Sequence, residues 1–380
     1  MIPVFDNDCA DWESRTSLAA RQCGGQNCNL DLNFSDGMTW IARIRLDDPH
    51  LPPPALQKHV FLSEVATLRF LEGTAVPAPA VYAYAPDSPS NPVGTSYVLM
   101  EKLPGRALDW VSANSDQRAR IVEQLVDVYI ELEKRPFPLM GSLIGDIVSS
   151  GSRNNMGSFA QLPCFSSPTE SLGPFPNLKE ACEATITQQM SFLSNKEISS
   201  LPVDNYLSFL WRLSVLPNLV AGSASANGPF YLKHYDDKGD HILVDDEYNI
   251  TGIIDWEWAS AEAKEYAFSS PCMMWPVGKF YDGANDLSEE EKHFASGFDQ
   301  RGRPDLGDMV RHGRRWQRFL FFLGGGIPAD MDEFKPLFQG LRQSFAAGEN
   351  IEPYEEWKKE ALKVFANNQA LSRLVEENLQ

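Results

Sequence analysis

The sequence predicts an α+β protein with two unequal parts, a small β-rich lobe that carries one helix and a larger, mainly helical lobe. Three observations predict this fold class. Strand-like runs dominate the first hundred residues, one helical run interrupts them, and most of the remaining chain has helical periodicity. At 380 residues, of which 43% are hydrophobic and 22% charged, the chain can bury a sizeable core.

Alternating apolar and polar residues predict the strands of the small lobe. Residues 30–46 alternate around Asp36-Gly37, a dipeptide that is typical of a β-hairpin turn. Two further strand-like runs, 80–84 and 96–100, are separated by a segment rich in turn-forming residues. A sheet that includes at least one antiparallel hairpin is therefore expected.

Helical periodicity appears first after a proline-rich break. Phe61, Val65 and Leu68 lie on one stripe of that run. A second helical pattern starts at Ser115, which is expected to be its N-cap. The apolar face of this second helix comprises Ile121, Leu125, Val128 and Leu132. Residues 145–176 are rich in Gly, Ser, Pro and Asn and are expected to form a long loop, after which the chain is again mostly helical.

The charge balance limits the partners. The chain has 52 acidic and 33 basic residues, a formal net charge of −19, so nucleic acids and anionic membranes would be repelled. The longest apolar cluster, Phe319–Phe322, is far too short to span a bilayer. The N-terminus lacks a basic leader followed by an apolar run, and the six cysteines are scattered, as is typical of reduced thiols. We therefore expect a cytoplasmic protein with no nucleic-acid or membrane partner.

The segment 228–258 concentrates residues that can do chemistry. Within it, residues 242–244 and 250–254 are apolar runs around a polar turn, which predicts a short β-hairpin. In an antiparallel hairpin, the residues before the first strand and after the second lie at the same end. The polar loop 234–241 should therefore face Asp255. Candidate ligands and bases at this end are Asp236, Asp237, Asp240, His241 and Asp255.

Asp255 stands out because it follows the apolar run Gly-Ile-Ile. A carboxylate buried at such a place is costly unless a metal or a hydrogen-bond donor meets it. Hard carboxylate oxygens suit Mg²⁺, which usually completes its shell with substrate phosphates. The alternative for any single acid in this group is a role as a turn former or a helix cap.

The same residues resemble a family pattern. His234 and Asp236, followed by a short hairpin and Ile254-Asp255-Trp256, match the pattern H-x-D-x-x-x-x-N, hairpin, I-D-W/F. This pattern is the catalytic and metal loop of the aminoglycoside phosphotransferase family, also called choline-kinase-like phosphotransferases, and the chain resembles its fungal-type members. The resemblance implies a protein-kinase-like two-lobe fold, with a small N-terminal antiparallel sheet and a larger helical lobe.

The resemblance also implies a reaction. The γ-phosphoryl group of ATP, or of another nucleoside triphosphate, would be transferred to a hydroxyl of a small molecule, and catalysis would consist mostly of positioning and charge neutralisation. Asp236 would accept the hydroxyl proton, and Lys238 would reach the γ-phosphate. Asp255 would hold Mg²⁺ between the phosphates.

Upstream segments extend the resemblance to the small lobe. Arg43 resembles the strand cation that contacts the phosphates, and Glu64 resembles its helical ion-pair partner. Glu64 borders the packed stripe of its helix and needs a partner, for which Arg43 is the obvious candidate. Gly24-Gly25 lies where the phosphate-covering turn should be, although an ordinary turn explains a glycine pair equally well.

The hinge between the lobes is expected at residues 101–105, so that residues 1–100 form the nucleotide lobe and 106–380 the catalytic and acceptor-binding lobe. The backbone near Glu101 and Leu103 would hydrogen-bond the base, with Met100 against its face. These roles come from the resemblance.

Two positions depart from the family pattern. His241 stands where the family has a metal-binding Asn, and an imidazole is a poorer Mg²⁺ ligand than an amide oxygen, so a second metal is lost or Mn²⁺ is favoured. Arg43 replaces the usual Lys and offers a planar fork instead of a point donor. The alternative function is therefore a kinase-fold pseudoenzyme that binds nucleotide or a partner without efficient turnover. A protein kinase proper is disfavoured, because Asp-Trp-Glu at 255–257 replaces D-F-G.

The acceptor would bind in the large lobe. In the family, acids and aromatic residues there bind amino-sugar or choline-like cations. The corresponding candidates are Glu257, Glu262, Glu265, Trp256, Trp258 and Trp275. The alternative is that Glu257 and Glu262 cap and solvate a helix. The sequence indicates neither the acceptor nor the oligomeric state.

Overall fold

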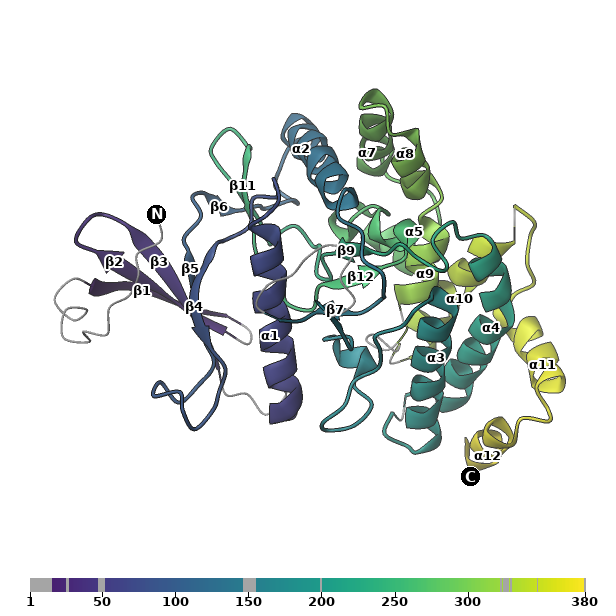
Figure 1. Ribbon diagram of the computed structural model, residues 1–380. Helices are drawn as coiled ribbons and strands as arrows, with labels where there is room; N and C mark the ends of the chain where they lie inside the picture. The colour runs from purple at the N-terminus through teal and green to yellow at the C-terminus, as the bar shows by residue number, and fades with distance from the viewer. Residues whose placement is uncertain are drawn as a thin grey trace.

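The small lobe is an antiparallel sheet with one helix, as the sequence predicts (Figure 1). A computed structural model describes residues 16–24, 27–46, 52–145, 155–198, 200–321, 323, 328, 330–346 and 348–378. Its five-stranded sheet has the order β1-β2-β3-β5-β4, with every neighbouring pair antiparallel. The strands are β1 (Thr16–Gly24), β2 (Asn27–Phe34), β3 (Thr39–Arg45), β4 (Val81–Ala85) and β5 (Tyr97–Glu101).

The hairpin predicted within residues 30–46 is β2–β3, in which Leu30 pairs with Ala42. Its turn has the expected chemistry. Gly37 adopts φ +88°, and the Met38 backbone N–H donates to Asp36 Oδ1 at 3.0 Å. Strands β4 and β5 each begin one residue later than predicted.

The single helix of the small lobe, α1 (Pro54–Leu71), packs between the sheet and the large lobe (Figure 1). A proline at its first turn suits the helix start, because the N–H that proline lacks would be unpaired there. Phe61, Val65 and Leu68 are buried, as the apolar stripe predicts. Glu64 lies between them and is only 5% exposed, so its carboxylate must find a partner inside the molecule.

The large lobe is mainly helical. Its helices are α2 (Ser115–Glu133), α3 (Leu178–Ser194), α4 (Pro202–Ala221), α5 (Lys264–Ala267), α6 (Val277–Tyr281), α7 (Glu289–Gln300), α8 (Pro304–Arg311), α9 (Arg314–Phe321), α10 (Met331–Phe345), α11 (Tyr354–Val364) and α12 (Gln369–Asn378). Two short 3-10 turns, η3 (Leu162–Cys164) and η4 (Cys272–Met274), accompany them. The N-cap of α2 is Asn114, which forms a capping box with Gln117, so the assignment of Ser115 as the cap is wrong by one residue.

Short strands support the chemistry-bearing loops of the large lobe. They are β6 (Arg106–Ala107), β7 (Ser142–Leu143), β8 (Met156–Gly157), β9 (Tyr231–Lys233), β10 (Ile242–Val244), β11 (Ile250–Ile253) and β12 (Ser260–Glu262). The order β11-β10-β6 shows that the chain leaving the small lobe adds a strand directly to the predicted hairpin. The expected loop at 145–176 contains β8 and η3 in its described part.

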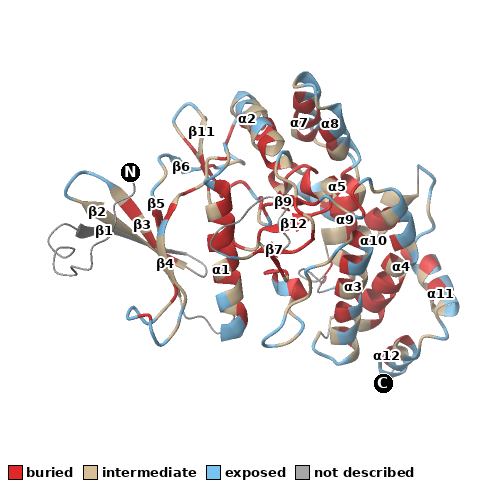
Figure 2. Cartoon of the chain, in the orientation of Figure 1, coloured by how far each residue is buried: buried red, intermediate tan, exposed pale blue. Residues whose placement is uncertain are grey.

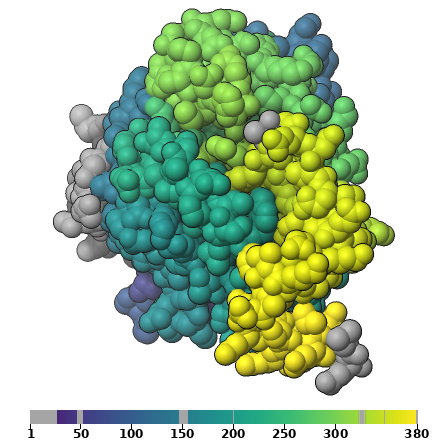
Figure 3. Space-filling model, turned by 90° about the vertical axis from the view of Figure 1, so that its right-hand side faces the viewer, coloured from purple at the N-terminus to yellow at the C-terminus, as the bar shows by residue number. Residues whose placement is uncertain are grey.

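Burial concentrates where these strands meet the helices. Figure 2 shows a continuous buried layer through α1 and β7, β9 and β12, whereas the outer sides of α7, α8 and α11 are exposed. The C-terminal helices cover the end of the large lobe beside α3 and α4 (Figure 3). No helix in the described part of the chain is long and apolar enough to cross a membrane.

The cysteines only partly follow the expectation of reduced thiols. Cys164, Cys182 and Cys272 are free thiols. Cys28 is disulfide-bonded, so the expectation is wrong for this residue.

Candidate active site

The hairpin β10–β11 brings the polar loop and Asp255 to one end, as expected from its antiparallel pairing. Ile242 pairs with Ile253. The Ile254 backbone N–H donates to His241 O at 2.9 Å, and His234 Nε2 lies 3.0 Å from Ile254 O. Both ends of the loop 234–241 are therefore fixed to the residue that precedes Asp255.

Asp255 sits in a left-handed backbone conformation, with φ +62°. Such a conformation is uncommon for residues other than Gly, Asn and Asp, and it turns the side chain away from the strand direction. The next residue, Trp256, is 2% exposed, and its indole N–H donates to Ile253 O at 2.9 Å. The buried indole thus fixes the turn, while the Asp255 side chain stays half-exposed.

Arg43 on β3 lies opposite, and it contacts three carboxylates. Its Nη1 donates to Glu64 of α1. Its Nη2 donates to Asp255 Oδ1 at 2.8 Å and to Glu257 Oε2 at 3.0 Å. The predicted Arg43–Glu64 pair is therefore present, and the same guanidinium also contacts the residue expected to hold the metal.

Electrostatics in this group are dominated by burial. Burial alone would lower the pKa of Arg43, but the carboxylates of Glu64, Asp255 and Glu257 outweigh it and raise the pKa above its ordinary value. Burial also raises the pKa of Glu64, and the Arg43 guanidinium opposes that rise. Arg43 is consequently a permanent cation at the centre of the site.

A cleft of about 660 Å³ lies between the lobes beside this group. Residues from both lobes line it, including Arg43, Glu64, Met100, Glu101, Leu103, Asp240 and Asp255. The Glu101 backbone N–H donates to Ala80 O at 2.9 Å, so this N–H is already paired within the small lobe. Gly24 is the last residue of β1, and Gly25 lies outside the described residues.

Asp236 and Lys238 form an ion pair in the loop. Lys238 Nζ lies 2.9 Å from Asp236 Oδ2, and the hydrogen bond to Asp236 raises the pKa of Lys238. Both side chains are open to solvent, at 35% exposed for Asp236 and 57% for Lys238. The pair can therefore be separated by an incoming substrate at modest cost.

The neighbouring acid, Asp237, has a structural role that the sequence did not reveal. Its Oδ2 accepts from Lys233 Nζ at 3.0 Å, and both side chains are buried. Its Oδ1 accepts from the Cys272 backbone N–H at 2.8 Å. Asp237 thus anchors the loop to the large lobe and leaves Asp236 as the accessible carboxylate.

His241 packs inward. Its side chain is buried, and its ring stacks on His234 with centroids 4.2 Å apart. Its Nδ1 accepts from the Gly239 backbone N–H at 3.3 Å, which places the ring proton on Nε2 in the neutral form. Burial, with the nearby cations, holds the pKa of His241 well below its usual range. Neutral His241 therefore has its Nδ1 lone pair already engaged.

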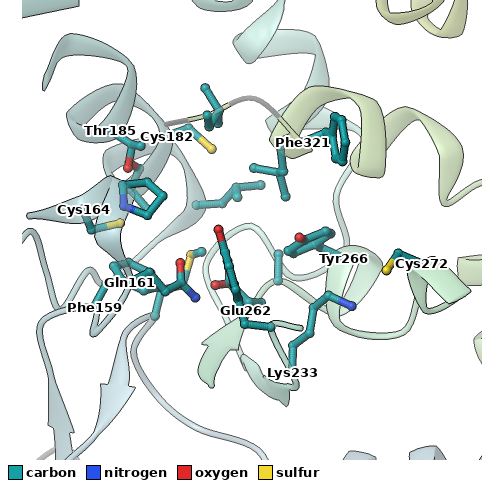
Figure 4. Close-up of a pocket in the computed structure, with 18 of the residues that line it drawn as sticks. Phe159, Gln161, Cys164, Cys182, Thr185, Lys233, Glu262, Tyr266, Cys272 and Phe321 are labelled. Atoms are coloured by element: carbon teal, nitrogen blue, oxygen red, sulfur yellow. The ribbon is translucent and has the colours of Figure 1, made fainter. Parts of the chain in front are cut away.

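A second pocket, of about 470 Å³, lies in the large lobe behind the loop (Figure 4). Tyr235 and Asp237, on either side of Asp236, line it together with segments from α3, η3 and the end of α9. Glu262 lies in the middle of the view, with Gln161 on one side and Lys233 and Tyr266 on the other. Most of the remaining lining is apolar or aromatic, and comprises Phe159, Trp275, Tyr281, Leu320 and Phe321 among others.

Of the six residues expected to bind the acceptor, Glu262 and Trp275 line this pocket. The other four do not line it. Glu257 pairs with arginines of β3, and Trp256 is buried beneath His234. Glu265 accepts from the Ala224 backbone N–H at 2.6 Å and from Ser225 Oγ at 2.7 Å. Trp258 is absent from the lining, and its backbone oxygen accepts from Gln161.

Glu262 is the unusual group of this pocket. It is 7% exposed, and its Oε1 accepts from Ser260 Oγ at 2.6 Å. No lysine or arginine among the described residues forms an ion pair with it. Burial raises the pKa of Glu262 to about 7, against the opposing effects of Ser260, Lys233 and Gln161.

The donor chemistry of the interlobe cleft fits a hard cation. In the described ranges, no group of three or more His, Cys, Asp or Glu side chains could hold a metal ion alone. Asp240 and Asp255 nevertheless both present carboxylates to the cleft. Mg²⁺ is commonly bound by one or two carboxylates plus substrate phosphates and water, so this pair fits a metal that arrives with a nucleotide.

Known protein sequences match the chain over a short segment. No family model matches the sequence. Subtelomeric hrmA-associated cluster proteins from two strains of Aspergillus fumigatus are 35% identical over 123 residues, which is 32% of this chain. The match spans 23% of the length of each of these relatives.

Solved structures match over most of the chain. The Plasmodium vivax ethanolamine kinase is 13% identical, with 94% of this chain and 84% of that chain covered and a TM-score of 0.48. The GDP complex of wild-type aminoglycoside 2'-phosphotransferase-IIIa is 18% identical, with 88% of this chain and 94% of that chain covered and a TM-score of 0.47. The macrolide 2'-phosphotransferase of Brachybacterium faecium is 13% identical, with 89% of this chain and 97% of that chain covered and a TM-score of 0.44.

Aminoglycoside phosphotransferases and related kinases are thus among the proteins that this chain is similar to. They are the group that the motif around Asp236 resembles.

Proposed function

We propose that this protein transfers the γ-phosphoryl group of a nucleoside triphosphate, with ATP as the expected donor, to a hydroxyl of a small molecule. One observation carries the proposal. An accessible carboxylate, Asp236, lies in a loop that is fixed at the same end of a hairpin as Asp255, and Asp255 contacts the buried Arg43–Glu64 pair beside a cleft. This arrangement supplies a base, an acid for a metal and a cation for phosphates in one place.

The roles follow from accessibility and charge. Asp236 would accept the hydroxyl proton of the acceptor or orient the hydroxyl. Lys238, which pairs with Asp236 in the structure, would turn to the γ-phosphate. Arg43, held by Glu64, would contact the phosphates that are not transferred. Asp255, with Asp240 nearby, would hold Mg²⁺, which when bound neutralises phosphate charge.

The cleft would take the nucleotide. Met100 and Leu103 line it and would contact the base, with residues 101–105 as the hinge between a nucleotide lobe, 1–100, and an acceptor lobe, 106–380. The glycines at 24 and 25 would lie near the phosphates.

The second pocket would take the acceptor. It begins at Tyr235 and Asp237, so an acceptor bound there would lie beside Asp236. Its walls are mainly apolar, and its buried carboxylate, Glu262, lacks an ion-pair partner in the described structure. An acceptor with an apolar body and an amine or other donor group fits such a pocket, because the donor would pair with Glu262.

The alternative is a pseudoenzyme that binds nucleotide without turnover. His241 favours it, because its stacked ring fits a packing role better than metal ligation. Asp236 favours the enzyme, since a binding module does not need an accessible carboxylate paired with an exposed lysine.

Two experiments test the proposal in sequence. Thermal-shift measurements with ATP, with and without Mg²⁺ or Mn²⁺, should show metal-dependent stabilisation, and its absence would contradict both alternatives. A transfer screen with labelled ATP over aminoglycosides, choline, ethanolamine, sugars and homoserine-like alcohols should then give a labelled product. Stabilisation without any transfer or ATP hydrolysis would favour the pseudoenzyme.

A further inference from the structure

Two arginines of β3 point at one buried carboxylate of the large lobe. Arg43 and Arg45 are two residues apart on a strand, so their side chains lie on the same face of the sheet. Glu257 contacts both, with Oε2 3.0 Å from Arg43 Nη2 and Oε1 2.6 Å from Arg45 Nη1. Its side chain is 7% exposed and that of Arg45 12%, so these ion pairs are largely shielded from water.

A neighbouring amide completes the group. With its oxygen toward Arg43, the Asn27 side chain accepts from Arg43 Nε at 3.2 Å and from Nη2 at 2.7 Å. Asn27 pairs with Arg45 in the β2–β3 register, so Asn27 lies on the strand next to the two arginines that contact Glu257 and supports Arg43. The contact between the lobes is thus formed by Glu257 on one side and by the arginines of β3, supported by Asn27 of β2, on the other.

The contacts of Arg43 differ in how easily they can be exchanged. Asp255 is half-exposed and in the cleft, whereas Glu64 and Glu257 are buried. An exposed ion pair costs little to break, but a buried carboxylate that loses its partner pays a desolvation penalty. When a nucleotide phosphate replaces Asp255 beside Arg43, Glu64 and Glu257 can therefore keep the guanidinium in place.

Arg45 determines whether Glu257 can hold the Arg43 guanidinium in place without repelling the nucleotide phosphate. Among the described residues, the group holds three carboxylates, Glu64, Asp255 and Glu257, and two guanidiniums. Without Arg45, a single guanidinium would face all three carboxylates, and the uncompensated charge of Glu257 would lie beside the phosphates. We propose that Arg45 and Glu257 form an interlobe clamp, a positioning pair that holds the lobes together and keeps Arg43 available for phosphate.

The clamp adds a polar link to the apolar packing of α1 against the large lobe. Arg45 is the last residue of β3, and Glu257 follows the hairpin of the large lobe. The Ile253 backbone N–H also donates to Pro77 O at 2.6 Å, which is a second bond between the small-lobe segment and this hairpin. The existence of the clamp does not depend on the proposed function, but its role toward phosphate does.

The experiment compares Arg45→Met, Glu257→Gln, the double variant and the conservative Arg45→Lys with wild type. Arg118→Met is the control, because Arg118 pairs with Glu290 in a more exposed ion pair within the large lobe and neither residue lines the cleft. The first readout is hydrogen exchange without nucleotide. Arg45→Met should increase exchange in β3 and in residues 254–258, and Arg118→Met should not.

The second readout is the Kd for ATP with Mg²⁺, measured by calorimetry, together with the split between KM and kcat. Arg45→Met should raise the Kd about tenfold or more, and Arg45→Lys should raise it less. The Kd of the double variant should not exceed that of the single variant that binds ATP more weakly. If Arg45→Met matches the Arg118→Met control in both readouts, or if the two single effects multiply in the double variant, the clamp is refuted. If wild type binds no nucleotide, the proposed function fails, and the exchange readout still decides the clamp.

Discussion

Arg43 Nη2 lies 2.8 Å from Asp255 Oδ1, so the cation of the small lobe directly contacts the acid expected to hold the metal. Without a nucleotide, each group satisfies the charge of the other. A metal–nucleotide complex would give both groups new partners at once, phosphate for Arg43 and the metal for Asp255. The contact therefore links metal dependence to nucleotide affinity.

The contact between Arg43 and Asp255 predicts that one substitution has opposite effects on ATP binding with and without divalent metal. Asp255→Asn should weaken ATP binding in Mg²⁺ by at least about tenfold, the equivalent of one charge-assisted interaction of about 1.4 kcal/mol. Without divalent metal, the same variant should bind ATP as well as or better than wild type, because Arg43 is released. Calorimetric titration under both conditions measures this. Asp246→Asn, at the exposed turn of the hairpin, is the control, and equal weakening with and without metal would contradict the assignment of Asp255.

His241 gives a second prediction. His241→Asn removes a ring stacked on His234 and should lower the free energy of unfolding by about 1–3 kcal/mol. It also places an amide oxygen where the phosphotransferase pattern that this loop resembles has its metal-binding Asn, so activity in Mg²⁺ relative to Mn²⁺ should rise. Transfer or hydrolysis rates in the two metals are the measurement. An unchanged ratio and an unchanged rate would show that our account of this position is wrong.

Glu262 makes stability depend on pH. Its pKa is raised by burial to about 7, so between its ordinary value and pH 7 the folded state binds more protons than the unfolded state. This contribution to the free energy of unfolding therefore falls as pH rises through that window. Glu262→Gln should remove this pH dependence. Its free energy of unfolding, relative to that of wild type, should rise by up to about 3 kcal/mol between pH 5 and pH 8, at about 1.4 kcal/mol per pH unit.

Urea denaturation of wild type and Glu262→Gln at both pH values measures this difference. Glu183→Gln, an exposed acid of α3, is the control and should keep the wild-type pH dependence. A gain for Glu262→Gln that is the same at pH 5 and pH 8 would contradict the burial of an ionisable carboxylate in this pocket.

Gly105 lies where the chain passes between the lobes. Its φ is +102°, and an added Cβ would meet Thr251 Oγ1 at 2.5 Å and Val244 O at 2.6 Å. Gly105→Ala should therefore cost roughly 1–2 kcal/mol of backbone strain plus about 1–3 kcal/mol of overpacking. Gly94→Ala is a matched control, since Gly94 also has positive φ but nothing within 4 Å of the added Cβ. Equal losses of stability in the two variants would refute the steric argument.

Local patterns predicted much of the fold and of the cleft. The hairpin around Asp36-Gly37 followed from alternation and turn chemistry, and both survive in the structure. The Arg43–Glu64 pair followed from the family resemblance, supported by the place of Glu64 on the edge of a packed helical stripe. The meeting of the loop with Asp255 followed from antiparallel geometry alone. In each case, a short segment determines where its side chains point.

The parts that were missed depend on longer-range geometry. Glu257 was expected beside the acceptor, but the left-handed residues Asp255 and Trp258 redirect the chain around it, so no periodicity predicts its direction. The large-lobe pocket combines segments near Gln161, Lys233 and Phe321, far apart in the sequence. The inward packing of His241 likewise depends on its contact with His234.

The central claim is that Asp236 is the catalytic carboxylate of a phosphotransferase. The most direct test is the single-turnover rate of phosphoryl transfer, or of ATP hydrolysis, in wild type and Asp236→Ala at saturating ATP and metal. The rate should fall at least about a hundredfold, the size of a general-base contribution, while ATP affinity and the unfolding midpoint change little. Equal rates in the two proteins would contradict the account.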